Sequence, residues 1–530
     1  MSAGGDTLTE AGPEASADLG AGTRALFGRY GPNYRWLATV TVMLGSIATV
    51  LSATIVNVAI PDIMLEFDLQ QDQAQWLSTG FLAAMTACML LTAWSIERFG
   101  QRNTFLLGMG LFTAGSVLGA LAPSGAAVIT ARVLQGAAAG LVAPQAMATV
   151  FRVFPPDRRG RAMGIYGIGV ILAPALGPTV GGVLVDQWSW HYVFLLPVPA
   201  CAAGALMALY FLPGREHSEP PRPFDAVGFA LLVGALIGML SGLADGQRLG
   251  WHSTRVLAPL LGGLTLGTAF VFWQRFSRRP LLDVALFTHL RFSAACLVAF
   301  IVGAGIYGST YLIPLFVQLV QDYSPTRAGL LLMPAGLVLG VVFPLSGRLS
   351  DQVGPTGPIL AGLALFALSA VLLAAAGATT SFAWLAAWVC LGRIGLGLLL
   401  PSLNMGALRV LPMTLVNQGS GAVNFMRQLG GAFGVNALAI LLEMRVDHHA
   451  ARLLAARGRD IEPGLLAQIG ARGYDAGGDA ALQALADRAQ VLAFHDSFYV
   501  TGLIFGLAVL PAWLFGRRGR TAQAADTASA

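Results

Sequence analysis

The chain alternates between long apolar runs and short polar segments over almost its whole length. A helix needs about 20 mostly apolar residues to cross the hydrocarbon core of a bilayer, and about fourteen runs reach that length. We place these runs at residues 37–60, 74–96, 103–122, 125–151, 161–184, 192–212, 226–244, 256–274, 293–320, 327–349, 358–377, 382–408, 418–443 and 496–515. The pattern predicts an all-α integral membrane protein.

The charges between the runs predict its orientation. Arginines cluster before the first run and after the second, fourth, eighth and last runs, for example at Arg35, Arg98, Arg161, Arg275 and Arg517. The first loop on the other side instead carries the acids Asp62, Glu66, Asp68 and Asp72. Positively charged loops stay on the cytoplasmic side, and an even number of spans puts both ends on one side. We therefore expect both termini in the cytoplasm.

Three motif residues of the first part of the chain recur in the second part at nearly the same separation. The pairs Glu97/Asp351, Arg132/Arg393 and Pro155/Pro412 are 254, 261 and 257 residues apart. Two parallel halves of six helices are a transporter architecture, although chance recurrence in so apolar a chain is the alternative. The predicted parts are a disordered cytoplasmic tail (1–35), a first six-helix half (36–214), two inserted helices (215–280), a second half (281–516) with an outer loop near 445–495, and a cytoplasmic tail (517–530).

Composition excludes several other classes of protein. Only 11% of the residues are charged and 55% are hydrophobic, whereas a soluble domain carries about 25% charged residues. The four cysteines stand singly in apolar runs and are expected to be core residues. The chain contains no phosphate-binding loop and no nucleophile elbow, so we expect no enzyme, catalytic residue, cofactor or metal. His448, His449 and His495 are a weak metal signal, for which a solvated, partly helical loop is the better interpretation.

At this point the motifs resemble a known family. "LSATIVNVAIP" (51–61), "TAWSIERFGQR" (92–102), "RVLQGAAAG" (132–140) and "APALGPTVGG" (173–182) resemble the first half of the major facilitator superfamily. "GRLSDQVG" (347–354) and "NFMRQLGGAFG" (424–434) are similar to its fourteen-helix drug:proton antiporters of the EmrB/QacA type. The resemblance implies the major facilitator fold and a bacterial inner-membrane protein that exports drugs in exchange for protons. It also implies alternating access, and for some relatives a periplasmic adaptor protein as a partner.

The fifth run contains residues that ordinarily break helices. Proline in a helix interior costs about 3 kcal/mol and glycine about 1 kcal/mol, yet "GVILAPALGPTVGGVL" (169–184) contains both. We expect Pro174 and Pro178 to bend this helix. Its glycines should let a neighbouring helix approach closely; they are Gly169, Gly177, Gly181 and Gly182. The resemblance implies a role in antiport, and plain small-residue packing is the alternative.

Arg132 lies well inside the fourth run. An arginine at the centre of a bilayer costs about 2.5–3.5 kcal/mol on insertion scales, so we expect this one to face a polar interior. Snorkelling to the membrane edge is the alternative. The resemblance implicates Arg132 in proton transfer, and Arg393 is its repeat partner.

The loop after the second run contains Glu97, Arg98, Gly100 and Arg102. Glycine permits a tight turn here, and the charges can pair with each other and with helix ends to close the inner face. Asp351 repeats the pattern in the second half. Ala93 and Glu97 depart from the glycine and aspartate usual in the family. Taken alone, the loop would be a solvated charge cluster.

Two apolar runs carry polar faces. Asn417, Ser420, Asn424, Arg427 and Gln428 recur every three or four residues, as one side of a helix does. Tyr307, Tyr311 and Gln318 recur similarly in the ninth run. Such faces avoid lipid, so we assign these residues to a central substrate cavity, together with Ser52, Asn57 and Gln135. Hydrogen bonding between helices is the alternative for each residue.

The first run lacks an expected acid. The resembled family usually has aspartate before "TIVNVA", whereas this chain has Ser52, which does not titrate near neutral pH. The remaining candidate carboxylates fall at or near the predicted helix ends: Asp62, Asp186, Asp322, Asp351 and Glu443. Either an end carboxylate works with Arg132 in proton coupling, or coupling is weak and the substrate is neutral or anionic. The alternative function is therefore a dedicated carrier of one metabolite or vitamin, importing or exporting it with weak or no coupling.

The predicted topology can be tested directly. Reporter fusions placed after Arg161 and near Ala480 are expected to report opposite sides of the membrane, because an odd number of spans separates them. Matched alkaline phosphatase and green fluorescent protein fusions measure this. Two fusions that report the same side would refute the topology.

Overall fold

The computed structural model describes residues 20–69, 71–215, 223–277, 280–323, 325–456 and 480–516, and every regular element in these ranges is a helix. A short helix, α2 (Ala21–Tyr30), precedes the first span. The first half of the chain forms α3 (Tyr34–Phe67), α4 (Gln71–Met89), α5 (Leu91–Phe99), α6 (Gln101–Ala120), α7 (Gly125–Val153), α8 (Arg159–Gln187), α9 (His191–Leu195) and α10 (Val198–Phe211).

The remaining helices follow in the predicted order. The inserted pair is α11 (Ala226–Leu249) and α12 (Thr254–Phe276), and the second half forms α13 (Leu290–Leu319), α14 (Pro325–Val353), α15 (Thr356–Leu373), α16 (Phe382–Arg409), α17 (Val416–Ala456), α19 (Ala480–Leu507) and α20 (Val509–Gly516). Each predicted run therefore coincides with one helix or with two consecutive ones. By length and composition, the described residues contain 12 helices able to cross a membrane, or 13 with the α4/α5 pair, which is bent by 56°. α8 covers the fifth run with 29 residues.

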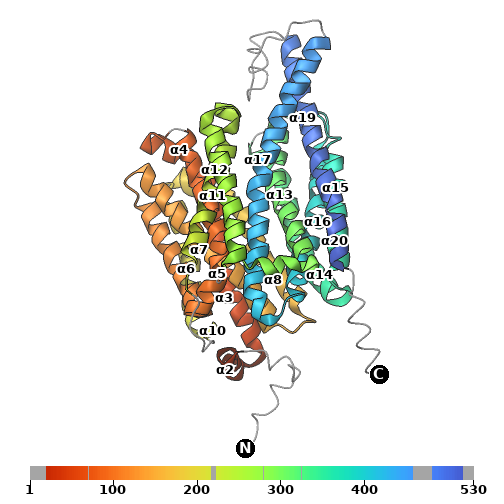
Figure 1. Ribbon diagram of the computed structural model, residues 1–530. Coiled ribbons are helices and arrows are strands. Elements are labelled where there is room, and N and C mark those ends of the chain that lie inside the picture. The colour runs from red at the N-terminus through yellow and green to blue at the C-terminus, as the bar shows by residue number, and fades with distance from the viewer. Residues whose placement is uncertain are drawn as a thin grey trace, which may run out of the picture.

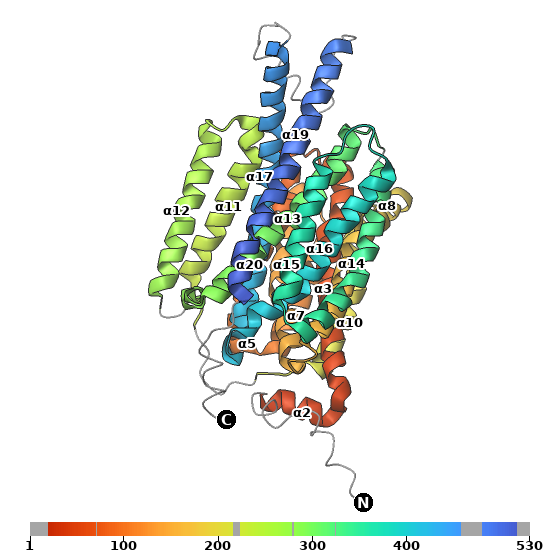
Figure 2. The ribbon, with the colours of Figure 1, turned by 90° about the vertical axis from the view of Figure 1, so that its right-hand side faces the viewer.

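The helices lie roughly side by side in one elongated bundle (Figure 1). α11 packs against α4 of the first half and α17 of the second, whereas α12 packs chiefly on α11 (Figure 2). We call the end of the bundle that carries α2 the terminal face, because the end of α20 also lies toward it. We call the other end, where α17 and α19 protrude, the far face (Figure 1).

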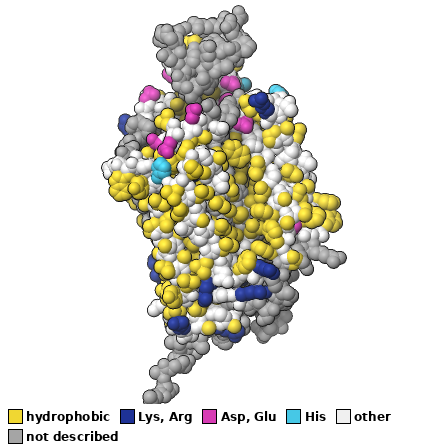
Figure 3. Space-filling model, turned by 90° about the vertical axis from the view of Figure 1, so that its left-hand side faces the viewer, with side chains coloured by type: hydrophobic (Ala, Val, Ile, Leu, Met, Phe, Trp, Pro, Cys, Tyr) yellow, Lys and Arg dark blue, Asp and Glu magenta, His cyan; other side chains and the backbone are white. Residues whose placement is uncertain are grey.

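The surface agrees with a membrane-embedded body. Figure 3 shows a broad hydrophobic surface, with most acidic side chains toward the far face and most arginines toward the terminal face. This distribution matches the charge asymmetry along the sequence. Positive charge is generally retained on the cytoplasmic side of a membrane protein.

The expected outer loop near 445–495 is mostly helical where it is described. α17 continues to Ala456 and α19 begins at Ala480, so the two helices form a hairpin that protrudes from the far face (Figures 1 and 2). A small apolar cluster holds the hairpin together; it includes Ala450, Leu454, Leu485 and Ala489. Glu443, which the run boundaries placed at a helix end, consequently lies inside α17. Residues 457–479 are outside the described part.

Two histidines of this hairpin make polar contacts with neighbouring groups. His449 Nε2 lies 2.8 Å from a carboxylate oxygen of Asp496, and Arg445 Nε lies 3.1 Å from the same oxygen. His495 Nε2 lies 2.6 Å from the carbonyl oxygen of Ala376. In the described residues no three metal-ligating side chains gather.

The glycines of α8 bring it against α3, as predicted, with one exception. A Cβ added at Gly177 would overlap Thr54 Oγ1, and one at Gly181 would lie 2.7 Å from Ile55 Cγ1. At Gly169 the added carbon would lie 2.9 Å from Met43 Sδ. The expectation for Gly182 was wrong, because nothing lies within 4 Å of its added carbon. Pro174 and Pro178 belong to α8, but their side chains are outside the described part.

The different surroundings of Gly177 and Gly182 provide a matched pair of variants. Gly177→Leu is expected to force α8 and α3 apart, at a cost of about 1–3 kcal/mol or more, and to lower both thermal stability in detergent and transport. Gly182→Leu adds the same side chain in open space, so it should leave both close to wild type. Thermal denaturation followed by size-exclusion chromatography measures the first effect. Equal stability of the two variants would show that no tight α3–α8 contact exists.

Candidate functional site

A buried arginine forms the polar centre of the first half. Arg132, in α7, is only 1% exposed. Its Nε donates to the carbonyl oxygen of Leu77 at 2.9 Å, and its Nη1 donates to Ser52 Oγ at 3.1 Å and Gln135 Oε1 at 2.9 Å. The guanidinium carbon also lies 4.2 Å from the ring centroid of Phe81, a cation–π distance. Arg132 therefore faces a polar interior, as predicted, and does not snorkel.

Neutral groups complete this network. Gln135 Nε2 donates to Ser116 Oγ at 2.9 Å, and Ser52 Oγ lies 3.4 Å from Gln135 Oε1. In the part of the chain that the structure describes, the network includes no carboxylate. Ser52, which replaces the family's usual acid, is thus a direct partner of Arg132. Ser116 and Phe81 were not predicted, because nothing local in the sequence connects them to Arg132.

Close helix packing creates this geometry. A Cβ added at Gly136 would overlap the carbonyl oxygen of Phe81, so α7 and α4 touch backbone to backbone one turn from Arg132. That approach brings both the Leu77 carbonyl and the Phe81 ring within reach of the guanidinium. The glycine after "RVLQ" is therefore part of the arginine site.

A second polar cluster lies on α17, where the spacing predicted a polar face. Asn417, Ser420, Asn424 and Gln428 are all at most 8% exposed. Ser420 Oγ donates to the carbonyl oxygen of Pro144 in α7 at 2.7 Å, so this face contacts the first half. Arg427 Nη2 donates to Asn424 Oδ1 at 2.5 Å, and the Tyr307 hydroxyl donates to Gln428 Oε1 at 3.1 Å.

Arg427 lies between the two halves. Its guanidinium interacts electrostatically with the phenols of Tyr166, on α8, and Tyr307, on α13. The Tyr166 hydroxyl donates to Ser46 Oγ of α3 at 3.0 Å. Tyr166 was not predicted, and its polar tip in an apolar run is the only signal the sequence offers.

The other predicted cavity residues do not join this cluster. Asn57 is exposed, and its Oδ1 accepts a hydrogen bond from Ser78 Oγ at 3.0 Å. Tyr311 packs against an apolar cluster of the second half that includes Phe316 and Phe498. Gln318 Nε2 donates to the carbonyl of Pro314 in its own helix at 3.1 Å. Of the three predicted α13 residues, Tyr307 is the one that joins the polar residues of α17 in the described structure.

Arg393 occupies the corresponding place in the second half. It lines a small cavity with Ser309, Ser369 and Thr501. Ser309 follows Ser52 by 257 residues, within the repeat spacing, so each arginine lies near a serine of the first helix of its half. The repeat thus extends to the surroundings of the two arginines.

The loop after α5 is anchored inside its own half. Gly100 has φ +82°, where L side chains are strained, and a Cβ there would lie 2.5 Å from the backbone nitrogen of Arg215. Arg102 Nε donates to the carbonyl of Leu212 at 2.9 Å, as the predicted pairing with helix ends requires. Arg98 is exposed, and Glu97 lines a small cavity with Gln418 of α17.

Asp351 instead crosses between the halves. Its Oδ1 accepts the backbone N–H of Gly160 at 2.8 Å, and its Oδ2 accepts that of Arg161 at 2.9 Å. These N–H groups begin α8, where the helix dipole favours a negative charge. A Cβ at Gly347 would overlap the Gly160 carbonyl, and one at Gly164 would lie 2.7 Å from Cα of Pro344.

These contacts between the halves lie near one face. Asp351 and Gly347 are at the terminal-face end of α14, Gly160 begins α8 there, and Ser420 lies one turn into α17. In the described residues, the two halves are therefore sealed together at the terminal face.

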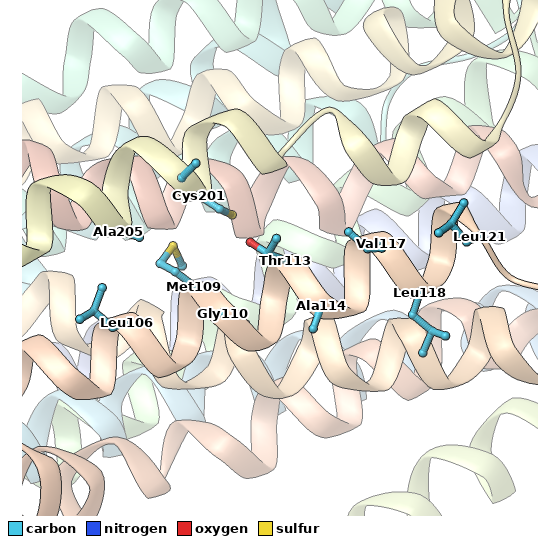
Figure 4. A pocket seen from close by; sticks show the side chains of 11 residues that line it. Leu106, Met109, Gly110, Thr113, Ala114, Val117, Leu118, Leu121, Cys201 and Ala205 are labelled. Carbon is cyan, nitrogen blue, oxygen red and sulfur yellow. The ribbon is translucent and has the colours of Figure 1, made fainter.

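An apolar groove lies elsewhere, between α6 and α10. Figure 4 shows its lining, which includes Leu106, Met109, Val117 and Cys201, with Thr113 as a polar exception. Its volume is ≈ 860 Å³. Leu121 at one end is 75% exposed, so the groove opens to the surroundings of the bundle, where lipid chains fit its chemistry.

Comparison with known proteins agrees with this architecture. A family model described as Major Facilitator Superfamily matches residues 42–435, and the chain belongs to that superfamily. It is 31% identical over 409 residues to the "Multidrug resistance protein Stp" of Mycobacterium tuberculosis (strain CDC 1551 / Oshkosh), covering 77% of this chain and 75% of that protein. It is 29% identical over 412 residues to the "Tetracenomycin C resistance and export protein" of Streptomyces glaucescens, covering 78% and 76%.

The fold also matches a solved transporter. The proton:xylose symporter XylE superposes with a TM-score of 0.59 at 14% sequence identity, covering 92% of this chain and 97% of that one. At this identity the likeness concerns the fold. The chain is therefore a multi-pass membrane transporter of the superfamily.

The Arg132 network predicts the behaviour of two variants. Arg132→Ala and Arg132→Gln are both expected to lose transport while still reaching the membrane, because neither replaces the charge that Leu77, Ser52 and Gln135 hold. Each buried acceptor left unpaired costs about 1–3 kcal/mol. Export rate per membrane-inserted protein measures the effect, and Arg255→Gln, at an exposed position, is the control. Wild-type rates in both Arg132 variants would contradict a functional role.

Proposed function

We propose that this protein is a secondary active exporter of lipophilic drugs or amphipathic metabolites, working by alternating access. It would lie in the bacterial inner membrane with its terminal face toward the cytoplasm. Its moving parts would be the predicted halves, 36–214 and 281–516, with 215–280 inserted between them. The observation that carries the proposal is the seal between Asp351 and the start of α8, because it joins the two halves at the terminal face.

The seal suits a reversible gate. Asp351 binds two backbone N–H groups of the opposite half, and a few hydrogen bonds can break and re-form at modest net cost, about 0.5–1.5 kcal/mol each. The close contact between Gly160 and Gly347 adds apposed surfaces without interlocking side chains. With this gate closed toward the cytoplasm, the structure would represent the state that releases an exported compound.

The proposed substrate class rests on two kinds of support. Two relatives are named for multidrug resistance and for export of tetracenomycin C. In this chain, Tyr307, Asn424 and Gln428 belong to a polar and aromatic cluster of the second half, and Asn424 also contacts Met147 of the first half. Binding sites of that character place a few polar groups among apolar ones to orient a small molecule.

Proton exchange is the proposed energy source, with Arg132 as its central residue. One observation favours a second candidate function, a dedicated carrier with weak or no proton coupling. Ser52 Oγ lies 3.1 Å from Arg132 Nη1, where the resembled family usually has a titratable acid. A serine hydroxyl cannot carry the proton at neutral pH. Coupling would then need a carboxylate nearer the membrane edge, such as Asp62.

Transport in everted membrane vesicles distinguishes these possibilities. Vesicles with and without the protein are given several unrelated lipophilic fluorescent compounds, with an imposed pH gradient and then with a protonophore that abolishes it. The proposed function predicts uptake of several compounds into the vesicles, which corresponds to export from cells, and loss of that uptake when the gradient collapses.

Other outcomes decide against parts of the proposal. Uptake of a single compound would support the dedicated carrier. Uptake that persists after the gradient collapses would refute proton exchange. Vesicles that accumulate no compound beyond the protein-free control would refute the exporter.

A further inference from the structure

The ionisable groups of this protein are sorted by depth. In the described helices, the aspartates and glutamates lie toward helix ends or in the protruding hairpin. Glu443 follows Arg427 on α17 by 16 residues, and Asp62 follows Ser52 on α3 by ten. At 1.5 Å per residue these separations are about 24 Å and about 15 Å. The middle of the bundle instead holds arginines.

Arg132 and Arg427 differ in how they are held. Arg132 is almost fully buried, and three neighbouring residues accept its hydrogen bonds. Arg427 is partly exposed, and among the described residues it makes one hydrogen bond, to Asn424 Oδ1. A guanidinium has five N–H donors. Arg427 therefore keeps donors for a further acceptor, whereas Arg132 serves its own network.

The surroundings of Arg427 are those of a recognition site. Tyr307, beside it, is 37% exposed, so part of this cluster is not covered by protein. Asn424 and Gln428 are fixed by hydrogen bonds to Ser420 and Tyr307. A planar guanidinium among aromatic and amide groups matches a carboxylate on a flat molecule, because the fork of donors binds its two oxygens together. A phenolate oxygen can accept from the same donors singly.

We propose that the transported compounds are organic anions and that Arg427 binds their charged group; this rests on the proposed function. An anion would supply the negative charge that the central arginines lack, and attraction between charges strengthens as the local dielectric constant falls. An organic cation would instead meet the positive charge of Arg427, and the carboxylates of the described helices lie toward helix ends or in the hairpin. The protein should therefore discriminate by the sign of charge among molecules of similar shape.

Two dyes with the same xanthene ring system test this inference. Fluorescein is anionic at pH 8 and rhodamine 6G is cationic. Binding of each to the purified full-length protein is followed by fluorescence anisotropy, which does not depend on transport or on a gradient. We expect fluorescein to bind the wild type at least about tenfold more tightly than rhodamine 6G, as expected when one charge-assisted contact decides.

Variants test whether Arg427 causes the preference for the anionic dye. Arg427→Gln is expected to weaken fluorescein binding about tenfold or more and to leave rhodamine 6G binding equal or stronger, whereas Arg427→Lys keeps part of the affinity. Arg445→Gln is the matched control on the same helix, since Arg445 pairs with Asp496 near the far face. It should bind fluorescein like the wild type.

The outcomes separate this inference from the proposed function. Wild-type protein that binds rhodamine 6G more tightly, or does not bind fluorescein, overturns the inference even if vesicles export other compounds. Equal loss of fluorescein binding in Arg427→Gln and Arg445→Gln also overturns it. Selective loss in Arg427→Gln supports the inference even if proton exchange fails in vesicles.

Discussion

A guanidinium held inside a membrane protein imposes the strongest constraint on this structure. Arg132 needs acceptors where water is absent, and it obtains them from three helices: a backbone carbonyl of α4, a hydroxyl of α3 and an amide of its own helix α7. Because an unpaired buried group costs more than a bond contributes, the three helices must keep their relative positions. Gly136 permits the necessary approach of α7 to α4. The rest of the first half packs around this arrangement.

The two halves carry similar residues at corresponding positions, but these residues make different contacts. Arg132 is enclosed by hydrogen bonds, whereas Arg393 lines a small cavity with three hydroxyl side chains. Asp351 reaches across to the start of α8, whereas the loop containing Gly100 and Arg102 is fixed within its own half. An exact repeat would give two equivalent gates. The second half contributes the carboxylate that bonds to the other half, and the first half holds the most tightly bound charge.

The sorting of charges by depth connects the structure to the proposed transport. Carboxylates near the faces are solvated or pair with helix ends, where the dipole and nearby water stabilise them. Arginines tolerate the interior better because their charge is delocalised and weakly hydrated. Ser52 fits the same arrangement, since a hydroxyl next to Arg132 leaves the positive charge in place. This chain thereby departs from relatives of the resembled type that carry an acid in the first helix.

The sequence alone determined the helices and the burial of the polar face of α17. A chain in lipid must satisfy its backbone within each segment and must turn polar faces inward. The sequence also predicted that Arg132 faces inward, since the alternative is costly. Only the tertiary structure decided that Asp351 meets Gly160, that Arg427 lies near Tyr166 and that Gly182 touches nothing. These contacts join residues far apart in the chain, and their geometry depends on how close helices pack, which local pattern does not encode. The hairpin of α17 and α19 likewise depends on tertiary structure, because its apolar residues contact one another across the two helices.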